Sequence, residues 1–87
     1  MKEQEERKMA LEWIVKQIKN APRWFIPRRD IEKWYNELDL EPMSNMFQTS
    51  KNGGINGLTE DEETGELGYY SKDVINWLRK NENINGE

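Results

Sequence analysis

The sequence predicts a single, mainly α-helical domain with a small β-hairpin. The chain has 87 residues, the length of one domain, and a domain of this size buries roughly 60 to 65% of the surface that its unfolded chain exposes. Apolar residues recur at helical spacing in most of the sequence. One later segment, rich in glycine and acidic residues, instead contains two short apolar runs of the kind that form a hairpin.

Composition indicates a folded domain with unevenly distributed charge. Four Trp, three Tyr and two Phe argue against a disordered acidic chain, although the net charge is -4 and 34% of residues are charged. Residues 1–34 carry nine basic and six acidic side chains, which gives +3, whereas residues 35–70 carry one basic and eight acidic side chains, which gives -7. The central segment is therefore strongly acidic.

The sequence lacks the residues on which several classes of protein function usually depend. The sequence contains no Cys and no His, so it lacks the thiolate and imidazole groups on which most nucleophilic catalysis and zinc binding depend. We expect no enzyme activity, no cofactor and no metal. No segment has the roughly 20 apolar residues that span a bilayer, and the N-terminus lacks the apolar stretch of a signal peptide. We therefore expect a cytoplasmic protein without a membrane partner.

Two helices are expected in the first half of the chain. Residues 3–20 place apolar side chains at helical spacing among strong helix formers, and Pro22 ends this helix because proline has no N–H to donate to the preceding turn. Residues 23–26 then form a short extended piece. A second helix is expected over residues 27–38, with Pro27 in its first turn. Its apolar face consists of Ile31, Trp34, Tyr35 and Leu38.

The second half predicts a third helix, a hairpin and a last helix. In residues 41–54, three apolar side chains recur at helical spacing before Gly53 and Gly54 close the element. Short strands are expected around residues 55–58 and 67–70, joined by an acidic loop with Gly65 at its tip. Ser71 is expected to cap a last helix over residues 71–81. The expected apolar faces consist of Met43, Met46 and Phe47 in the third helix, and of Val74, Trp77 and Leu78 in the last helix.

We expect residues 1–87 to form a single domain, with the two ends of the chain outside its core. Residues 1–8 are mostly charged and residues 81–87 are mostly polar. We expect both segments to be flexible, as poorly packed termini usually are.

This order of elements resembles a winged helix-turn-helix domain. Residues 25–70, about half of the chain, are similar to the small winged-helix modules of viral and plasmid primase-helicases, in which an aromatic-rich helix precedes a recognition helix, a glycine and a hairpin wing. The matching residues are Trp34, Tyr35, Pro42, Ser44, Phe47, Gly54 and Gly65. The resemblance implies three helices plus a wing, followed here by a C-terminal helix. The sequence has no Gly-rich phosphate loop or polymerase motif, so no ATPase or primase activity is expected.

The resemblance also implies that the protein binds double-stranded DNA in a regulatory or replication-accessory role. The third helix would then be the recognition helix, and two arginines at the start of the second helix would lie near the phosphate backbone. The candidate DNA-binding residues are Arg28, Arg29, Ser44, Asn45, Gln48, Thr49, Lys51 and Asn52. An ordinary packing helix with a polar solvent-facing side would show the same pattern. That alternative stays open.

The acidic loop favours a different class of function. Carboxylates at this position would repel phosphates, and phosphate contacts supply most non-specific DNA affinity. The alternative is a small protein-interaction or inhibitor module that presents carboxylates to a basic partner, with Trp24 and Trp77 as candidate anchors. Its candidate residues are Glu60, Asp61, Glu62, Glu63 and Glu66. The cluster lacks the ligand spacing and fixed glycine of a calcium loop, so we expect a solvated loop without metal.

The first helix is a further candidate interface. Two copies of the chain paired through it would form a homodimer that carries two recognition helices to adjacent half-sites.

Overall fold

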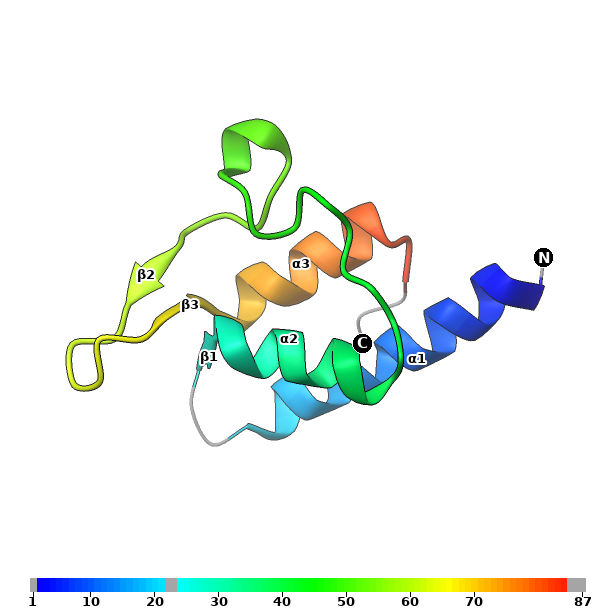
Figure 1. The fold of residues 1–87 in the computed structure, drawn as a ribbon, viewed down its shortest axis with the longest axis horizontal. Helices are drawn as coiled ribbons and strands as arrows, with labels where there is room; N and C mark the ends of the chain where they lie inside the picture. Colours follow the sequence, from blue (N-terminus) through cyan, green and yellow to red (C-terminus); the bar gives the residue numbers. More distant parts are fainter. Residues whose placement is uncertain (1, 22–23, 85–87) are drawn as a thin grey trace.

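In the residues that the structure describes, the protein folds as three α-helices and a small three-stranded antiparallel sheet, and about half of the residues are helical. The computed structural model describes residues 2–21 and 24–84. The elements are α1 (Lys2–Asn20), β1 (Phe25–Pro27), α2 (Arg28–Glu37), the 3-10 turn η1 (Ser50–Asn52), β2 (Thr59–Glu60), β3 (Leu67–Tyr70) and α3 (Ser71–Asn81). The hairpin of β2 and β3 projects from one end of the helices, and the N-terminal half of α1 projects at the other (Figure 1).

Strand β3 is the centre of the sheet, which has the order β1-β3-β2. Ile26 lies opposite Tyr69, and Phe25 lies opposite Tyr70. Because successive side chains of a strand point to opposite faces, these two pairs lie on different sides of the sheet. Ile26 and Tyr69 are 2% and 1% exposed and pack in the core. Phe25 and Tyr70 therefore belong to the side that faces away from it.

The core consists of one face from each helix together with the inner side of the sheet. The stripe predicted for α3 is buried. Of the face predicted for α2, Trp34 and Leu38 are only partly buried. The apolar spacing of α1 also includes Trp13, which is 36% exposed. Glu82 and Ile84, which follow α3, also pack against the body of the protein. The buried helical residues are Leu11, Ile14, Val15 and Ile18 of α1, Ile31 and Tyr35 of α2, and Val74, Trp77 and Leu78 of α3.

A paired cluster of polar side chains ties the ends of the fold together. Arg7 of α1 donates to both carboxylate oxygens of Glu82, from Nη2 at 2.7 Å and from Nε at 3.2 Å. The Tyr35 hydroxyl of α2 donates to the same carboxylate at 3.4 Å. The hydrogen bond to Glu82 raises the pKa of Arg7, and burial raises the pKa of Tyr35 well above its ordinary value of 10.0. This cluster joins α1, α2 and the segment after α3.

The predicted third α-helix in residues 41–54 is wrong. Residues 44–47 form a turn, Ser50–Asn52 form η1, and Thr49 between them is extended at φ -64° and ψ 156°. Of the three apolar residues on which the prediction rested, only Met46 is fully buried, at 0% exposure. The recognition α-helix that the winged-helix resemblance implies between α2 and the hairpin is therefore not formed by residues 41–54.

Local hydrogen bonding explains why this segment is not helical. It is rich in Ser, Thr and Asn, which are weak helix formers because their side chains offer the backbone other partners. Met46 accepts the N–H of Ile55 at 3.0 Å, so the chain returns on itself and buries both residues. Gly53 adopts a left-handed φ of 90°, a conformation that would strain any residue with a side chain. The apolar spacing is thus satisfied by a closed loop.

The structure also differs from the sequence prediction at the first hairpin strand and at the start of α3. The strand expected at residues 55–58 lies instead at Thr59–Glu60, because the segment before it closes the loop against Met46. The extended piece expected at residues 23–26 is confirmed in its described part, which forms most of β1 and also pairs with β3. The residue before α3 is Tyr70, without a side-chain cap, so Ser71 is not the N-cap.

The expected flexible ends are described only in part. Residues 2–8 form the first turns of α1, and residues 82–84 follow α3. Residues 85–87, like Pro22 at the expected end of the first helix, lie outside the described residues. Flexibility of the ends stays a prediction.

Replacing Glu82 by Gln should lower the free energy of unfolding by about 1–3 kcal/mol, because the Arg7 charge would lose its only ionised partner in the cluster. The Glu82 side chain is 8% exposed. The matched control is Glu32→Gln, which breaks an exposed pair with Arg28 and should change stability by less than about 0.5 kcal/mol. Urea unfolding measures both variants. Equal losses would contradict the structural role of the cluster.

Stability should fall as the pH rises above 10. A tyrosine whose pKa is raised by burial stabilises the fold fully below its unfolded-state value and loses that contribution as pH climbs toward its folded-state value. Burial raises the pKa of both Tyr35 and Tyr69. Urea unfolding of Tyr35→Phe between pH 8 and pH 12, values chosen to bracket the ordinary tyrosine pKa of about 10, should show a shallower decline than the unaltered protein. Parallel declines would contradict this assignment.

Candidate functional site

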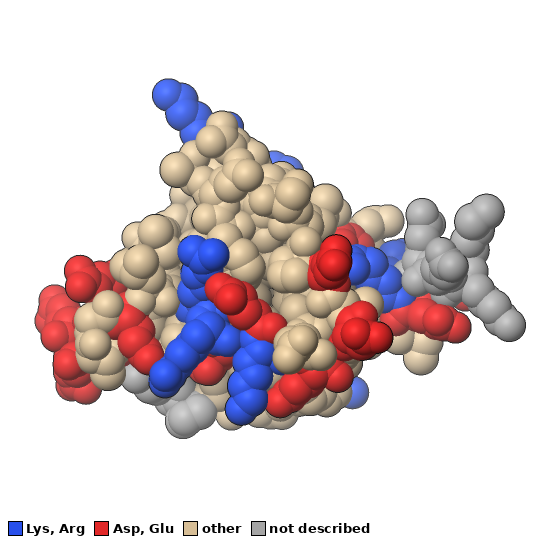
Figure 2. All heavy atoms as spheres, in the orientation of Figure 1, with Lys and Arg blue, Asp and Glu red and all other residues tan. Residues whose placement is uncertain are grey.

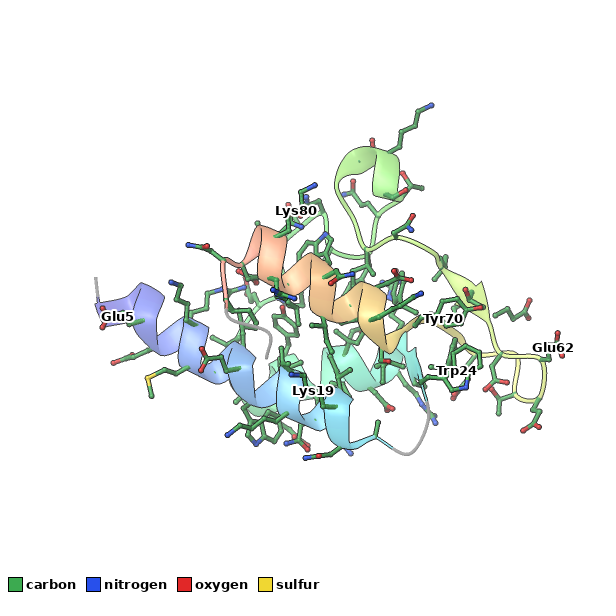
Figure 3. The ribbon with its side chains drawn as sticks, turned by 180° about the vertical axis from the view of Figure 1, so that it is seen from behind. Glu5, Lys19, Trp24, Glu62, Tyr70 and Lys80 are labelled. Atoms are coloured by element: carbon green, nitrogen blue, oxygen red, sulfur yellow. The ribbon has the colours of Figure 1, made fainter. Side chains whose placement is uncertain are left out.

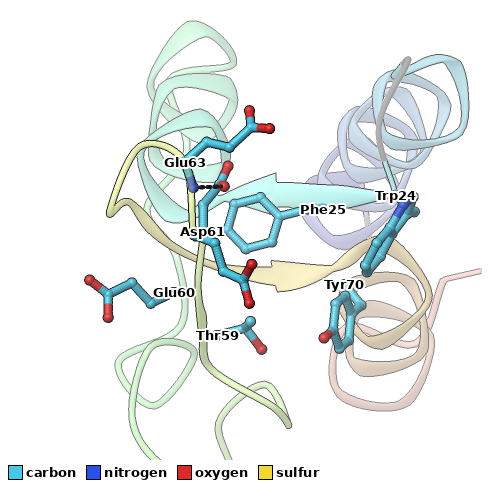
Figure 4. Close-up of a pocket in the computed structure, with 8 residues that line it drawn as sticks. Trp24, Phe25, Thr59, Glu60, Asp61, Glu63 and Tyr70 are labelled. Atoms are coloured by element: carbon cyan, nitrogen blue, oxygen red, sulfur yellow. Dashed lines mark hydrogen bonds between the residues drawn. The ribbon is translucent and has the colours of Figure 1, made fainter.

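A pocket of about 610 Å³ lies between the sheet and its acidic hairpin. Figure 4 shows two aromatic residues on one side of it, the hairpin on the other, and Phe25 between them. Its walls come from three chain segments, which meet only because β3 pairs with both β1 and β2. The lining residues are Trp24, Phe25, Thr59, Glu60, Asp61, Glu62, Glu63 and Tyr70.

Trp24 and Tyr70 form the aromatic side of this pocket. Their ring centroids are 4.9 Å apart and their planes are tilted by 30°, and the two labelled side chains lie side by side in Figure 3. The Trp24 carbonyl accepts the N–H of Ser71 at 2.7 Å, which extends the pairing of β1 and β3 by one residue. Trp24 is nevertheless 69% exposed. The fold thus holds a large aromatic surface in contact with solvent.

The floor of the pocket depends on Gly68 of β3. A Cβ built on this residue would lie 2.7 Å from the Phe25 ring and 2.8 Å from the Pro27 Cα. Both distances are shorter than packed atoms allow. Glycine therefore lets the Cζ end of the Phe25 ring approach the backbone of β3, between the aromatic and acidic sides of the pocket.

The acidic side of the pocket is a tight turn held by backbone and side-chain hydrogen bonds. Asp61 donates its N–H to the Glu66 carbonyl and accepts the N–H of Gly65 with its own carbonyl, both at 2.8 Å. Its carboxylate also accepts the N–H of Glu63 at 3.0 Å. Gly65 has a φ of 73°, as a tight turn at this position requires. Glu60, Glu62 and Glu63 are exposed, so carboxylates concentrate beside the pocket.

The structure places four of the five predicted protein-binding residues at the pocket and pairs the fifth with an arginine. Glu60, Asp61, Glu62 and Glu63 line the pocket, whereas Glu66 forms a 2.9 Å ion pair with Arg29 of α2. The two candidate anchors also differ. Trp24 is exposed, but Trp77 is 6% exposed and donates its indole N–H to the Gly53 carbonyl at 2.7 Å, so it is a core residue.

The two predicted DNA-contacting arginines lie at the start of α2 beside carboxylates. Arg28 donates to Glu32 at 2.8 Å and stacks over Phe47, with its guanidinium carbon 4.6 Å from the ring centroid. Arg29 pairs with Glu66. Figure 2 shows basic side chains over α2 interspersed with acidic ones, and a separate acidic group at the hairpin end. The face of α2 therefore has mixed charge.

The remaining predicted DNA-binding residues lie in the loop of residues 44–52 and not on an α-helix. Asn45 donates to the Gly53 carbonyl at 3.3 Å, and Gln48 donates to the Ser44 carbonyl at 3.2 Å, so both amides hold their own loop. Thr49 precedes η1, which contains Lys51 and Asn52. This 3-10 turn lies apart from α2 in Figure 1. The structure brings Arg28 against Phe47 but does not align the set along one helix.

Sequence reasoning missed Tyr70 and Phe25 as site residues. The signal was present in two short runs, residues 24–27 and 67–70, which read as strands with alternating faces. Cross-strand partners on one face lie close together. Pairing these runs would have placed Phe25 and Tyr70 side by side, but no partner strand was assigned to the first run.

Comparisons with known proteins add no further constraint on this site. No family model, curated protein or solved structure matches the chain. Among residues 2–21 and 24–84, no helix combines the length and apolarity needed to cross a membrane. Within the same residues, no group of three or more acidic side chains is arranged to hold a metal ion. Function must therefore be argued from the pocket and the charged surfaces.

Proposed function

We propose that the protein is a small interaction module that binds a basic segment of a partner protein in the pocket between Trp24 and the acidic hairpin. The observation that carries the proposal is the exposed Trp24 ring, held against Tyr70 beside a concentration of carboxylates. Large exposed aromatic residues are enriched where binding energy is concentrated at protein interfaces. The carboxylates define the chemistry of the partner, because opposite charge favours and orients association.

The distribution of charge supports a protein partner over a nucleic acid. Residues 35–70, which include the hairpin, carry a net charge of -7. This field would repel a phosphate chain and attract a lysine- or arginine-rich segment. Its range in solution is about 8–10 Å at physiological salt. Binding should therefore weaken as salt rises, while the aromatic contribution persists.

The first test is binding of a fluorescein-labelled peptide that carries Arg and Lys residues separated by Gly and Ser. Trp24→Ala should weaken its affinity about tenfold, the loss typical of an interface hot spot. Because Trp24 is mostly exposed, this change should leave the fold intact, which circular dichroism checks. Trp13→Ala is the matched control, since Trp13 lies on α1 and is 36% exposed. Equal affinity in all three proteins would contradict the proposal.

The carboxylates are tested separately. Glu62→Gln with Glu63→Gln should weaken peptide binding and flatten its dependence on salt. The control is Glu5→Gln with Glu6→Gln, which removes the same charge from an exposed part of α1. If both pairs of changes weakened binding equally, net charge rather than the pocket would determine affinity, and the site assignment would fail.

DNA binding by a winged-helix-like arrangement is the second candidate. It is supported by the contact of Arg28 with Phe47, which brings the start of α2 against the predicted recognition segment. Under this alternative, Arg28→Glu with Arg29→Glu abolishes binding to random duplex DNA, because phosphate contacts would be replaced by repulsion.

Fluorescence anisotropy at two salt concentrations separates the candidates. We expect the arginine reversals not to weaken peptide binding, because they add negative charge beside the hairpin, and we expect the unaltered protein to show no salt-sensitive DNA binding. Tight, salt-sensitive DNA binding that these reversals remove would instead favour the second candidate.

A further inference from the structure

We infer that the anchoring residue of the partner segment is an arginine rather than a lysine or a methylated lysine. This inference rests on the proposed function and specifies the side chain that the pocket recognises. It depends on three features of the structure: the contact between the exposed Trp24 ring and the half-buried Tyr70 ring, the carboxylates that line the same pocket, and an arginine elsewhere in the chain that contacts both an aromatic ring and a carboxylate.

The aromatic side of the pocket offers a stacked pair. Trp24 and Tyr70 are inclined by 30° with centroids 4.9 Å apart, so the two rings contact each other and leave no room for a cation between them. Recognition of a quaternary ammonium uses several rings that surround the cation as a cage. A stacked pair instead presents an outer ring face, and a planar guanidinium can lie parallel to it. This geometry favours arginine over the rounder head group of lysine or trimethyl-lysine.

The opposite side of the pocket supplies acceptors that suit the same group. A guanidinium has five N–H donors in a fixed fork and can bind a carboxylate through two parallel hydrogen bonds, whereas an ammonium acts as a point charge. Glu62 and Glu63 are exposed residues that line the pocket, and Figure 4 shows Glu63 on the side opposite Trp24. An arginine that enters between the two sides can stack on a ring while its N–H groups meet a carboxylate.

Arg28 shows this combination within the protein itself. Its guanidinium carbon lies 4.6 Å from the centroid of the Phe47 ring, and its Nε donates to Glu32 Oε1 at 2.8 Å. One arginine thus contacts an aromatic face and a carboxylate at once, on a surface where the Arg28 and Glu32 side chains are about half exposed. The pocket presents the same two kinds of partner in a larger space.

The experiment compares three peptides that differ only at one central position, which is Arg, Lys or trimethyl-Lys. Fluorescence anisotropy gives each dissociation constant, and the Trp24 indole resonance reports whether the pocket is occupied. Because a planar guanidinium can lie on the ring and bind a carboxylate through two hydrogen bonds, whereas an ammonium acts as a point charge, the Arg peptide should bind about threefold to fivefold more tightly than the Lys peptide. Trp24→Ala should bring this ratio close to one, and Trp13→Ala should preserve it.

The outcomes separate this inference from the proposed function. Equal or tighter binding of either lysine peptide, with the Trp24 resonance still shifted, would overturn the preference for arginine and leave the interaction module standing. An arginine preference that survives Trp24→Ala would also overturn the inference, because the guanidinium would then be seated elsewhere. Failure of all three peptides to bind would remove the proposed function together with the inference.

Discussion

The alternation of side chains across β1 and β3 is the constraint on which the pocket depends. Because Ile26 and Tyr69 must enter the core, their neighbours Phe25 and Tyr70 are placed on the opposite side of the same two strands. Gly68 then leaves room for the Phe25 ring against the sheet. Packing of the inner side thus determines the outer side, and the aromatic surface follows from the same pairing that completes the core.

The carboxylates at the two ends of the molecule have different surroundings. At one end, Arg7 and Tyr35 share the carboxylate of Glu82, so the charges there are mutually satisfied and hold helices together. At the other end, the glutamates of the hairpin are exposed beside Trp24. A paired carboxylate contributes to stability, whereas a group of exposed carboxylates creates a field that a basic partner can neutralise. The contrast supports assigning function to the hairpin end.

Sequence periodicity predicted the elements whose apolar faces are long enough to repeat. The first, second and last helices agree with the structure within a few residues, because each buries a stripe that recurs over several turns. Residues 41–54 offered only three apolar positions, and the closed loop fully buries only one of them, Met46. The pocket was predictable in part: its acidic wall and Trp24 could be named from the sequence, but Tyr70 and Phe25 required the pairing of strands distant along the chain.

The most direct test of the central claim is chemical-shift mapping of the labelled protein as an arginine-containing basic peptide is added. We expect the largest changes at the Trp24 indole, at Tyr70 and at the backbone of residues 60–63, with changes that shrink as salt is raised. The η1 loop and the start of α2 should be unaffected. Shifts concentrated at Arg28, Arg29 and residues 44–52, or no saturable shifts at low salt, would contradict the assignment of the pocket as the binding site.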